Sequence, residues 1–284
     1  MPPSPPSVPA PPARVVAVGD LHGDIAATRG VLRMAGLIDD HDHWSGGSAV
    51  LVQTGDQLDR GDDERAIVDL FSRLPVEARN AGGRVVALNG NHETMNVAGD
   101  FRYVTGGGLS AFANLSVRSA HASKAPPRFR ARAEAFLPGG QYAKKLAQRD
   151  VIAVVGDSVF VHGGVLPEHV TYGIDRINRE VRSWMEGSSP MPKVIASERA
   201  PVWVRDYSVA PVDARGCAML ERVLEQLSVR RMVVGHTIQK TGISSACGGA
   251  VFRIDVGLAA HYGHGPVEAL EITPAGVRIL GRGR

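Results

Sequence analysis

Short apolar runs recur along the chain, and each ends in glycine or in a polar residue. They are rich in valine and alanine, and they show little strict alternation of apolar and polar positions, which is typical of strands buried on both faces. Eight runs predict strands over residues 14–19, 49–55, 84–90, 151–156, 158–164, 231–236, 250–257 and 267–272. The chain is therefore expected to build its core around β-sheet.

Apolar residues at helical spacing fill several gaps between these runs. Helices are predicted over residues 25–37, 62–80, 172–186 and 213–227. Asp62, Asp63 and Glu64 are expected to form an acidic first turn, which the helix dipole favours, and Pro75 to kink or split the same helix. Helices alternating with strands indicate an α/β fold with helices outside a central sheet or pair of sheets.

Residues 105–140 depart from this alternation. The segment is glycine-rich, then basic, with little apolar periodicity. Because it is long for a connection, it is predicted to be an inserted loop or small cap. Its cations Lys124, Arg128, Arg130 and Arg132 either wall a substrate cleft or form a solvated basic surface, and the sequence favours neither.

Composition limits the domain organisation and the class of partner. The chain has 284 residues, of which 44% are hydrophobic, enough for one large core. We predict a proline-rich, disordered tail over residues 1–13 and a single catalytic domain over residues 14–284. The net charge of +3 is small and is not concentrated in a block, so no nucleic-acid partner is expected.

Cysteine count and hydropathy bear on the compartment. The two cysteines, Cys217 and Cys247, are expected to be reduced thiols, and they are too few for a cysteine zinc site. No apolar run approaches the ~20 residues that span a bilayer, and no secretory signal begins the chain. We therefore expect a cytoplasmic protein without a membrane partner, while an earlier loss of a targeting segment and the oligomeric state stay open.

Side chains that bind metals follow five of the predicted strands. The five segments read GDLHGD, GDQLDRG, GNHE, HGG and GH, and they deliver Asp20, His22, Asp56, Asn91, His162 and His236. In an open α/β sheet, ligands gather at the carboxyl ends of the strands, so these residues are expected to meet in space. Each segment alone is a weak signal, but five of them in order indicate one site.

The residue types suit a pair of divalent metal ions. Asp20 and His22 lie two positions apart and face the same side of an extended segment, and the carboxylate of Asp56 has two oxygens that can bridge two ions. Two divalent ions bring a charge of +4, of which Asp20 and Asp56 neutralise only two. The surplus is what a bound phosphate would neutralise. His41, His43, His121, His169, His261 and His264 fall outside the pattern and are expected on the surface or in structural roles.

These motifs, in this order, resemble the phosphoprotein phosphatase branch of the calcineurin-like metallophosphoesterases. The flanking text NGNHETMNVAG, VFVHGGVLPEHV, PVWVRDYS and VVGHTIQ resembles the Shewanella-like protein phosphatases of bacteria and plants. Animal serine/threonine phosphatases of the branch lack an insert like residues 105–140. The resemblance implies a β-sandwich of two mixed sheets flanked by helices, with an inserted cap.

The resemblance also implies a mechanism. One metal would be held by Asp20, His22 and Asp56, and the other by Asp56, Asn91, His162 and His236. A hydroxide bridging the metals would attack phosphorus in line with the leaving oxygen. His92 would be the general acid that protonates the leaving oxygen, oriented by Asp59.

Two arginines and one amide are expected to bind the substrate phosphate. Arg60 follows Asp59, and its planar guanidinium can bind two phosphate oxygens. Arg205, in PVWVRDYS, matches a phosphate-binding arginine of the family by position, and Asn91 offers its amide. The expected substrate is a phosphoprotein or phosphopeptide, with phosphotyrosine favoured by the resemblance over phosphoserine or phosphothreonine.

Alternatives stay open at this stage. A sister group with the same five motifs hydrolyses dinucleoside polyphosphates or small phosphates, and a phosphate-binding scaffold without turnover is a more remote possibility. Oxygen and nitrogen ligands without thiolate suit manganese, iron, zinc or cobalt, and we favour manganese.

Overall fold

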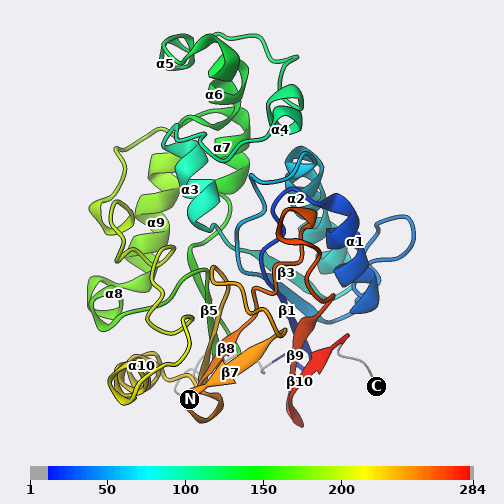
Figure 1. Ribbon diagram of the computed structural model, residues 1–284, viewed down its shortest axis with the longest axis vertical. Coiled ribbons are helices and arrows are strands. Elements are labelled where there is room, and N and C mark those ends of the chain that lie inside the picture. Colours follow the sequence, from blue (N-terminus) through cyan, green and yellow to red (C-terminus); the bar gives the residue numbers. More distant parts are fainter. Residues whose placement is uncertain (1–11, 282–284) are drawn as a thin grey trace, which may run out of the picture.

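Two five-stranded sheets form the centre of the molecule in the computed structural model, which describes residues 12–281 (Figure 1). The first sheet has the order β10-β9-β1-β2-β3, formed by Gly276–Leu280, Ala269–Thr273, Val15–Val18, Val50–Gln53 and Arg84–Ala87. The second has the order β4-β5-β6-β8-β7, formed by Ile152–Val155, Ser158–Val161, Arg231–Val234, Val251–Arg253 and Ser244–Ala246. The expected disordered tail falls, up to residue 11, outside the described residues.

Both sheets are mixed. Strands β1, β2 and β3 run parallel, as do β5, β6 and β8, while β9, β4 and β7 join them antiparallel. The carboxyl ends of the parallel strands of each sheet therefore share one edge. The predicted sandwich of two mixed sheets is confirmed.

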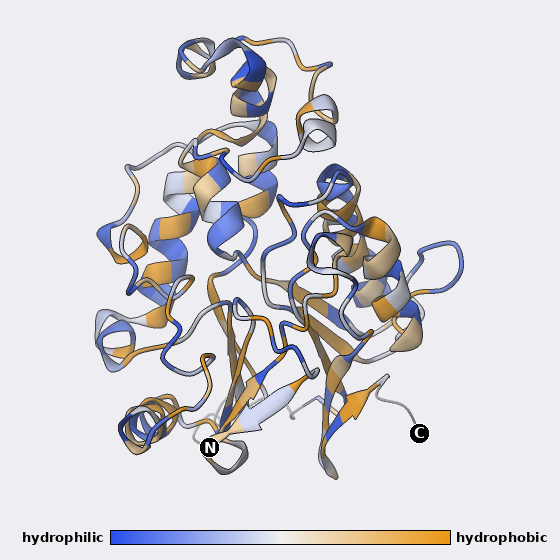
Figure 2. Cartoon of the chain, viewed as in Figure 1, coloured by the Kyte–Doolittle hydropathy of each residue, from blue (hydrophilic) through white to orange (hydrophobic). Residues whose placement is uncertain are grey.

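The lack of alternation in the strand sequences has a direct structural cause. In β5, Val159 and Val161 belong to a core shared with helices, whereas Phe160 between them belongs to a second core that includes β1 and β2. All three side chains are fully buried. Figure 2 shows the central strands as largely hydrophobic. Since both faces of the strand exclude water, neither set of positions needs to be polar.

Helices cover the sheets on both sides (Figure 1). They are α1 (Ile25–Met34), α2 (Glu64–Asn80), α3 (Asn91–Val97), α7 (Gln141–Leu146), α8 (Pro167–Tyr172), α9 (Ile174–Met185) and α10 (Ala214–Leu227), with short 3-10 turns at Pro127–Phe129, Lys193–Ile195, Cys247–Gly249 and Ala260–Tyr262. Asp24 caps α1 and Asp213 caps α10 through their side chains. Across residues 12–281 no helix combines the length and apolarity that crossing a bilayer requires.

The segment 105–140 forms a helical cap at the top of the view in Figure 1. It contains α4 (Gly106–Ser110), α5 (Ala120–Ser123) and α6 (Arg130–Phe136). Phe112 packs edge-on against Phe136 and Tyr142, with ring centroids 5.1 and 4.9 Å apart. The predicted cap is thus present. Its helices are too short to show the apolar periodicity by which a longer helix is recognised.

Several predicted elements differ from the structure. Helix α2 begins at Glu64 and runs unbroken through Pro75, so the prediction of a split is wrong there. The helix predicted over 172–186 is divided at Gly173, whose φ of 100° is left-handed. Strands β7 and β10 were not predicted, because β7 is three residues long and β10 lies at a sheet edge.

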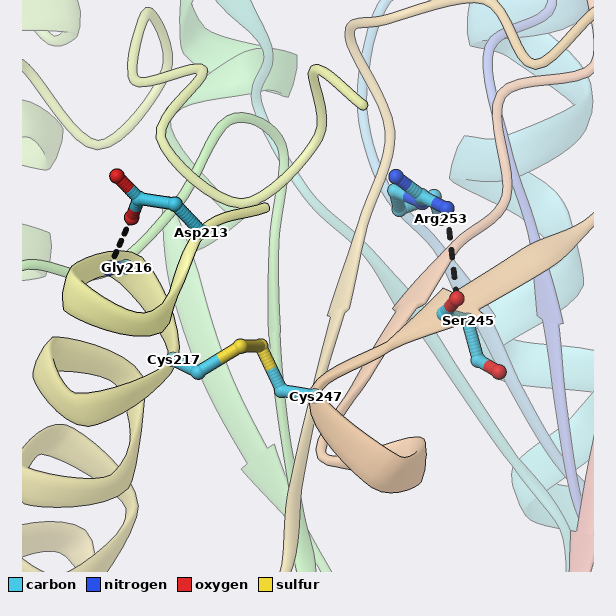
Figure 3. The surroundings of a disulfide bond; sticks show 6 residues. All are labelled: Asp213, Gly216, Cys217, Ser245, Cys247 and Arg253. Carbon is cyan, nitrogen blue, oxygen red and sulfur yellow. Dashed lines mark hydrogen bonds between the residues drawn. A yellow bond between two sulfur atoms is a disulfide. The ribbon is translucent and has the colours of Figure 1, made fainter. Parts of the chain in front are cut away.

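The expectation of two free thiols is also wrong. Cys217 on α10 and Cys247, directly after β7, form a disulfide (Figure 3). Their Cα atoms lie 5.4 Å apart because α10 packs beside the β7–β8 edge of the second sheet. A separation of 30 residues along the chain hides this contact from sequence analysis.

Candidate active site

The strand ends that carry the motifs do converge. The six predicted metal ligands are all at least 90% buried and come from both sheets: Asp20, His22, Asp56 and Asn91 follow β1, β2 and β3, and His162 and His236 follow β5 and β6. Five of the six line a cavity of about 280 Å³, and His162 lies behind it against Asp56. The shared edge of the parallel strands brings these residues together.

The first ligand group lies around the imidazole of His22. Its Nε2 is 3.9 Å from Asp20 Oδ2 and 3.8 Å from Asp56 Oδ2. Its Nδ1 lies 3.2 Å from the Leu58 carbonyl and can donate a hydrogen bond to it. That bond leaves Nε2 unprotonated and directed at the two carboxylates, as a metal-binding imidazole requires.

The second ligand group lies around His162. Its Nε2 is 3.1 Å from Asp56 Oδ2, 2.9 Å from Asn91 Oδ1 and 3.2 Å from His236 Nδ1. Its Nδ1 lies 3.0 Å from the Thr54 carbonyl, so Nε2 again faces the other ligands. His236 Nε2 is buried and finds no hydrogen-bond partner among the described residues. The crowding of His162 Nε2, Asp56 Oδ2, Asn91 Oδ1 and His236 Nδ1 fits a cation between them.

Electrostatics within the group also fit bound cations. Burial, together with the nearby Asp255 and Asp56 carboxylates, raises the pKa of Asp20 well above its usual value. Burial lowers the pKa of His22 to about 3 and that of His236 to about 2. Without a cation, the site therefore places carboxylates that repel each other beside neutral imidazoles. Carboxylates and neutral imidazoles are the forms of these side chains that bind divalent metals.

Asp56 departs from this pattern. Burial raises its pKa, but the imidazoles of His162, His92 and His22 outweigh burial and hold the pKa well below the usual value. A carboxylate that stays ionised between two ligand groups is suited to bridge two cations.

The backbone around the site is unusually strained. Across residues 12–281 nine non-glycine residues have a positive φ, and five of them belong to the predicted site: His22, Asp56, Asp59, Arg60 and His236. The carboxylate of Glu93 offsets part of this cost by accepting N–H bonds of 2.7–3.2 Å from Gly90 and from residues 56–58. Such strain typically gathers where side chains must be aimed at a ligand.

His92 forms a close pair with Asp59. Its Nδ1 is 2.6 Å from Asp59 Oδ2, and both side chains are buried. Burial lowers the pKa of His92, but the carboxylates of Asp56 and Asp59 outweigh it and raise the pKa above its usual value. His92 Nε2 lies 3.8 Å from Asp56 Oδ2, so distance alone would also admit His92 as a metal ligand. Its bond to Asp59 distinguishes it from His22 and His162, which face backbone carbonyls.

Both predicted phosphate-binding arginines line the cavity. The guanidinium of Arg60 stacks 4.1 Å from the centre of the Tyr103 ring and lies 3.4 Å from His261 Nε2. Arg205 donates to the His236 carbonyl at 3.0 Å and to Thr237 Oγ1 at 2.9 Å. The guanidinium groups of Arg60 and Arg205 thus lie on the wall of the cavity that contains the predicted metal ligands.

Sequence reasoning missed the aromatic wall. Tyr103, Trp203 and Tyr262 line the cavity, and each packs against one site histidine, His92, His236 and His22, with centroids 5.2–5.6 Å apart. No motif contains Tyr103 or Tyr262. Trp203 lies in PVWVRDYS, two residues before Arg205, and the resemblance of that segment to the family was the signal that could have identified it.

The cations of the cap do not wall this cavity. Lys124 and Arg128 line a separate cavity of about 520 Å³, and Arg130 is exposed. Arg132 is fully buried and pairs with Glu64, so reading it as a cleft or surface cation is wrong. Glu64 does lie in the first turn of α2, as predicted, but its side chain is buried and pairs with Arg132, while Asp63 is the N-cap and Asp62 precedes the helix.

Comparison with known proteins agrees with this geometry. Residues 13–240 match the family model described as calcineurin-like phosphoesterase. The chain is 42% identical to Shewanella-like protein phosphatase 2 of Arabidopsis thaliana, over 95% of this chain and 78% of the relative. It is 29% identical to Shewanella-like protein phosphatase 1 of Plasmodium berghei, over 89% and 69% of the two chains.

A solved structure has the same fold. The cold-active protein-tyrosine phosphatase of a psychrophilic Shewanella species superposes with a TM-score of 0.76 at 25% identity, over 94% of this chain and 80% of that one.

Proposed function

Since the chain belongs to the calcineurin-like phosphoesterase family, and within it to the Shewanella-like protein phosphatases, we propose that it removes phosphate from phosphoproteins and favours phosphotyrosine. It is a metal-dependent phosphoesterase, and the reaction takes place in the cavity that binds the phosphate. The single observation behind the proposal is the meeting of the two ligand groups, the His92–Asp59 pair and Arg60 in this one cavity.

Asp20, His22 and Asp56 would hold one divalent ion, and Asp56, Asn91, His162 and His236 the other. Divalent ions held by these residues would neutralise phosphate charge and would lower the pKa of a water molecule. We favour manganese, because carboxylate, amide and imidazole ligands suit it. The protein supplies ligands whose ring nitrogens already face one another, 3.2 Å apart in His162 and His236.

His92 is proposed to give its Nε2 proton to the leaving oxygen. Asp59 binds Nδ1 at 2.6 Å, which holds the ring in place and favours its protonated form. The raised pKa of His92 agrees with a proton donor that is loaded near neutral pH. Arg60 and Arg205 would hold the phosphate oxygens, with the Asn91 amide beside them.

The aromatic wall supports a phosphotyrosine substrate. Tyr103, Trp203 and Tyr262 surround the cavity, and aromatic side chains pack favourably against an aryl ring in offset or edge-on arrangements. The fold neighbour with a TM-score of 0.76 is a protein-tyrosine phosphatase, which supports the same preference.

A substrate panel tests this function. Peptides of one sequence carrying phosphotyrosine, phosphoserine or phosphothreonine would be compared with diadenosine tetraphosphate, with manganese supplied and the metal content of the same sample measured. We expect the highest kcat/KM on the phosphotyrosine peptide. Faster hydrolysis of the dinucleotide than of every peptide would favour the alternative small-phosphate function and reject ours.

A further inference from the structure

The cap reaches the proton donor through one buried arginine. Arg132, on α6, is 1% exposed and lies behind the cavity, where its guanidinium contacts four partners. It forms an ion pair with Glu64, including a bond of 2.9 Å to Oε2, and donates to the Gly108 carbonyl at 3.1 Å. Its Nε donates to Asn96 Oδ1 at 2.8 Å. Its Nη2 lies 3.5 Å from Asp59 Oδ1.

Two of these partners, Glu64 and Asn96, in turn hold Asp59. The Asp59 N–H donates to Glu64 Oε2 at 2.9 Å. The Asn96 side-chain amide donates to both Asp59 carboxylate oxygens, at 3.1 and 3.2 Å. The backbone and the carboxylate of Asp59 are therefore held by residues that Arg132 binds.

Arg132 also helps to fix which way the Asn96 amide faces. An amide has a donor end and an acceptor end, and an arginine offers only donors. Because Arg132 Nε occupies Oδ1 of Asn96, the NH₂ end is turned toward Asp59. A side chain without an N–H at this position would leave Asn96 Oδ1 without this donor, and the amide would be held only from its NH₂ end, by Asp59 and by the His92 carbonyl at 2.9 Å.

Charge gives Arg132 a second effect. Asp59 and Glu64 are two fully buried carboxylates, and Arg132 is the cation that pairs with both. Two buried carboxylates without a cation would repel each other and would be poorly solvated. With Arg132 present, Asp59, Glu64 and Arg132 together have a net charge of −1 beside His92. A protonated imidazole of His92 balances this charge.

We propose that Arg132 is a positioning residue for proton donation: from the cap, it orients Asp59 through Asn96 and Glu64, and Asp59 in turn orients His92. The inference rests on the proposed role of His92. The segment 105–140 then takes part in the reaction through Arg132, although none of its residues lines the cavity.

Three variants test this role. The double substitution Arg132→Met with Glu64→Gln removes the ion pair without leaving an unpaired buried charge. Arg132→Lys keeps the charge but loses the planar set of donors. Arg130→Met is the matched control, since Arg130 is exposed on the same helix and, within residues 12–281, its side chain bonds only to the Ala125 carbonyl, at 3.1 Å.

The kinetic measurement compares leaving groups. For each variant, kcat would be measured on a phosphoserine peptide, whose alkoxide needs a proton, and on p-nitrophenyl phosphate, whose leaving group departs without one. For the double variant we expect a loss of about a hundredfold on the peptide and of only a few fold on the aryl ester, with unchanged metal content. Arg132→Lys should fall between, and Arg130→Met should equal the parent protein.

A second measurement does not depend on turnover. Proton NMR of protein loaded with a diamagnetic divalent ion should show a low-field resonance for His92 Nδ1–H, identified by its absence in His92→Asn. The resonance should persist in Arg130→Met and should shift or broaden in both Arg132 variants.

Equal losses on both substrates, or a resonance unchanged in the double variant, would reject the positioning role. If the parent protein hydrolyses neither phosphoester, the proposed function fails, while the NMR result still decides whether Arg132 orients the pair.

Discussion

At the scale of single residues, two carboxylates three positions apart have different environments. Asp56 accepts the His92 N–H at 2.9 Å and lies 3.1 Å from His162 Nε2, so it faces the proposed metal ligands. Asp59 faces His92 Nδ1 and Asn96 instead. Left-handed backbone at Asp56 and Asp59, with φ of 56° and 65°, turns the chain between them. One motif therefore supplies two chemical environments.

Replacing His92 with asparagine should separate proton donation from metal binding. Asparagine cannot act as an acid, and it is too short to reach the leaving oxygen from the same backbone position. We expect kcat on a phosphoserine peptide to fall by about a hundredfold or more, with a much smaller loss on p-nitrophenyl phosphate and both metals retained. Steady-state kinetics and metal analysis check this, and equal losses on the two substrates would refute the general-acid role.

His169 should make stability depend on pH. Its Nδ1 accepts the Leu166 N–H at 3.0 Å and its Nε2 lies 2.9 Å from the Arg199 carbonyl, an arrangement that only neutral imidazole satisfies. Burial lowers its pKa below the ordinary 6.5. The unfolded chain therefore binds a proton at His169 at a higher pH than the folded chain does. The stability that the neutral His169 side chain contributes is fully present above pH 6.5 and is lost as the pH falls below that value.

Urea unfolding at several pH values between 8 and 5 checks the prediction for His169. The decrease in unfolding free energy toward low pH should be smaller in His169→Gln than in the parent protein. Parallel curves for the two proteins would show that His169 does not contribute.

The motif histidines and carboxylates could be identified from the sequence because their spacing after apolar runs is a local property. The aromatic wall and the Asn96–Arg132 contact could not, since Tyr103, Tyr262 and Arg132 have no distinctive neighbours in the sequence. Their position depends on how separate segments fold against β1, β2 and β3.

At the scale of elements, the turns after the strands need glycine for close packing. An added Cβ at Gly90, which precedes α3, would lie 2.7 Å from the Asp56 N and 3.0 Å from His162 Nδ1. Gly55, with φ of 100°, would bring a Cβ within 2.5 Å of the Gly90 N. The β2 and β3 turns therefore touch through their backbones, and this contact sets the separation of the two ligand groups.

Gly90→Ala should disturb this contact. Because its φ of −93° is ordinary, the effect would come from the clash and not from backbone strain. We expect weaker metal binding, seen as a lower metal-to-protein ratio after dialysis, together with reduced activity. Gly30→Ala is the control, since nothing lies within 4 Å of its added Cβ in α1, and alanine favours a helix. An unchanged metal ratio in Gly90→Ala would contradict the prediction.

At the scale of the whole molecule, the site joins the two sheets. Asp20, His22, Asp56 and Asn91 follow strands of the first sheet, whereas His162 and His236 follow strands of the second. An isolated bridge between Leu88, just after β3, and Asp150, just before β4, brings the end of β3 beside the start of β4. Ions held by ligands from both sheets would therefore bind the folded protein and not the unfolded chain.

Metal removal should lower the thermal stability. A ligand that binds only the folded state stabilises it by about 2.7 kcal/mol when its free concentration is a hundred times its Kd. We expect chelation to lower Tm by several degrees and added manganese to restore it, as measured by differential scanning calorimetry. Asp56→Asn, which would weaken the proposed bridging ligand, should show a smaller response. An unchanged Tm, with metal loss verified by elemental analysis, would contradict this linkage.

The sequence by itself determined eight of the ten strands in residues 12–281, the order of the motifs and the candidate metal ligands, because buried strands and metal-binding side chains leave local patterns. Only the tertiary structure decided that Arg132 and Glu64 are buried partners of Asp59, that Cys217 meets Cys247, and that three aromatic rings wall the cavity. Burial and pairing depend on which distant segments meet, and that is a property of the packed chain.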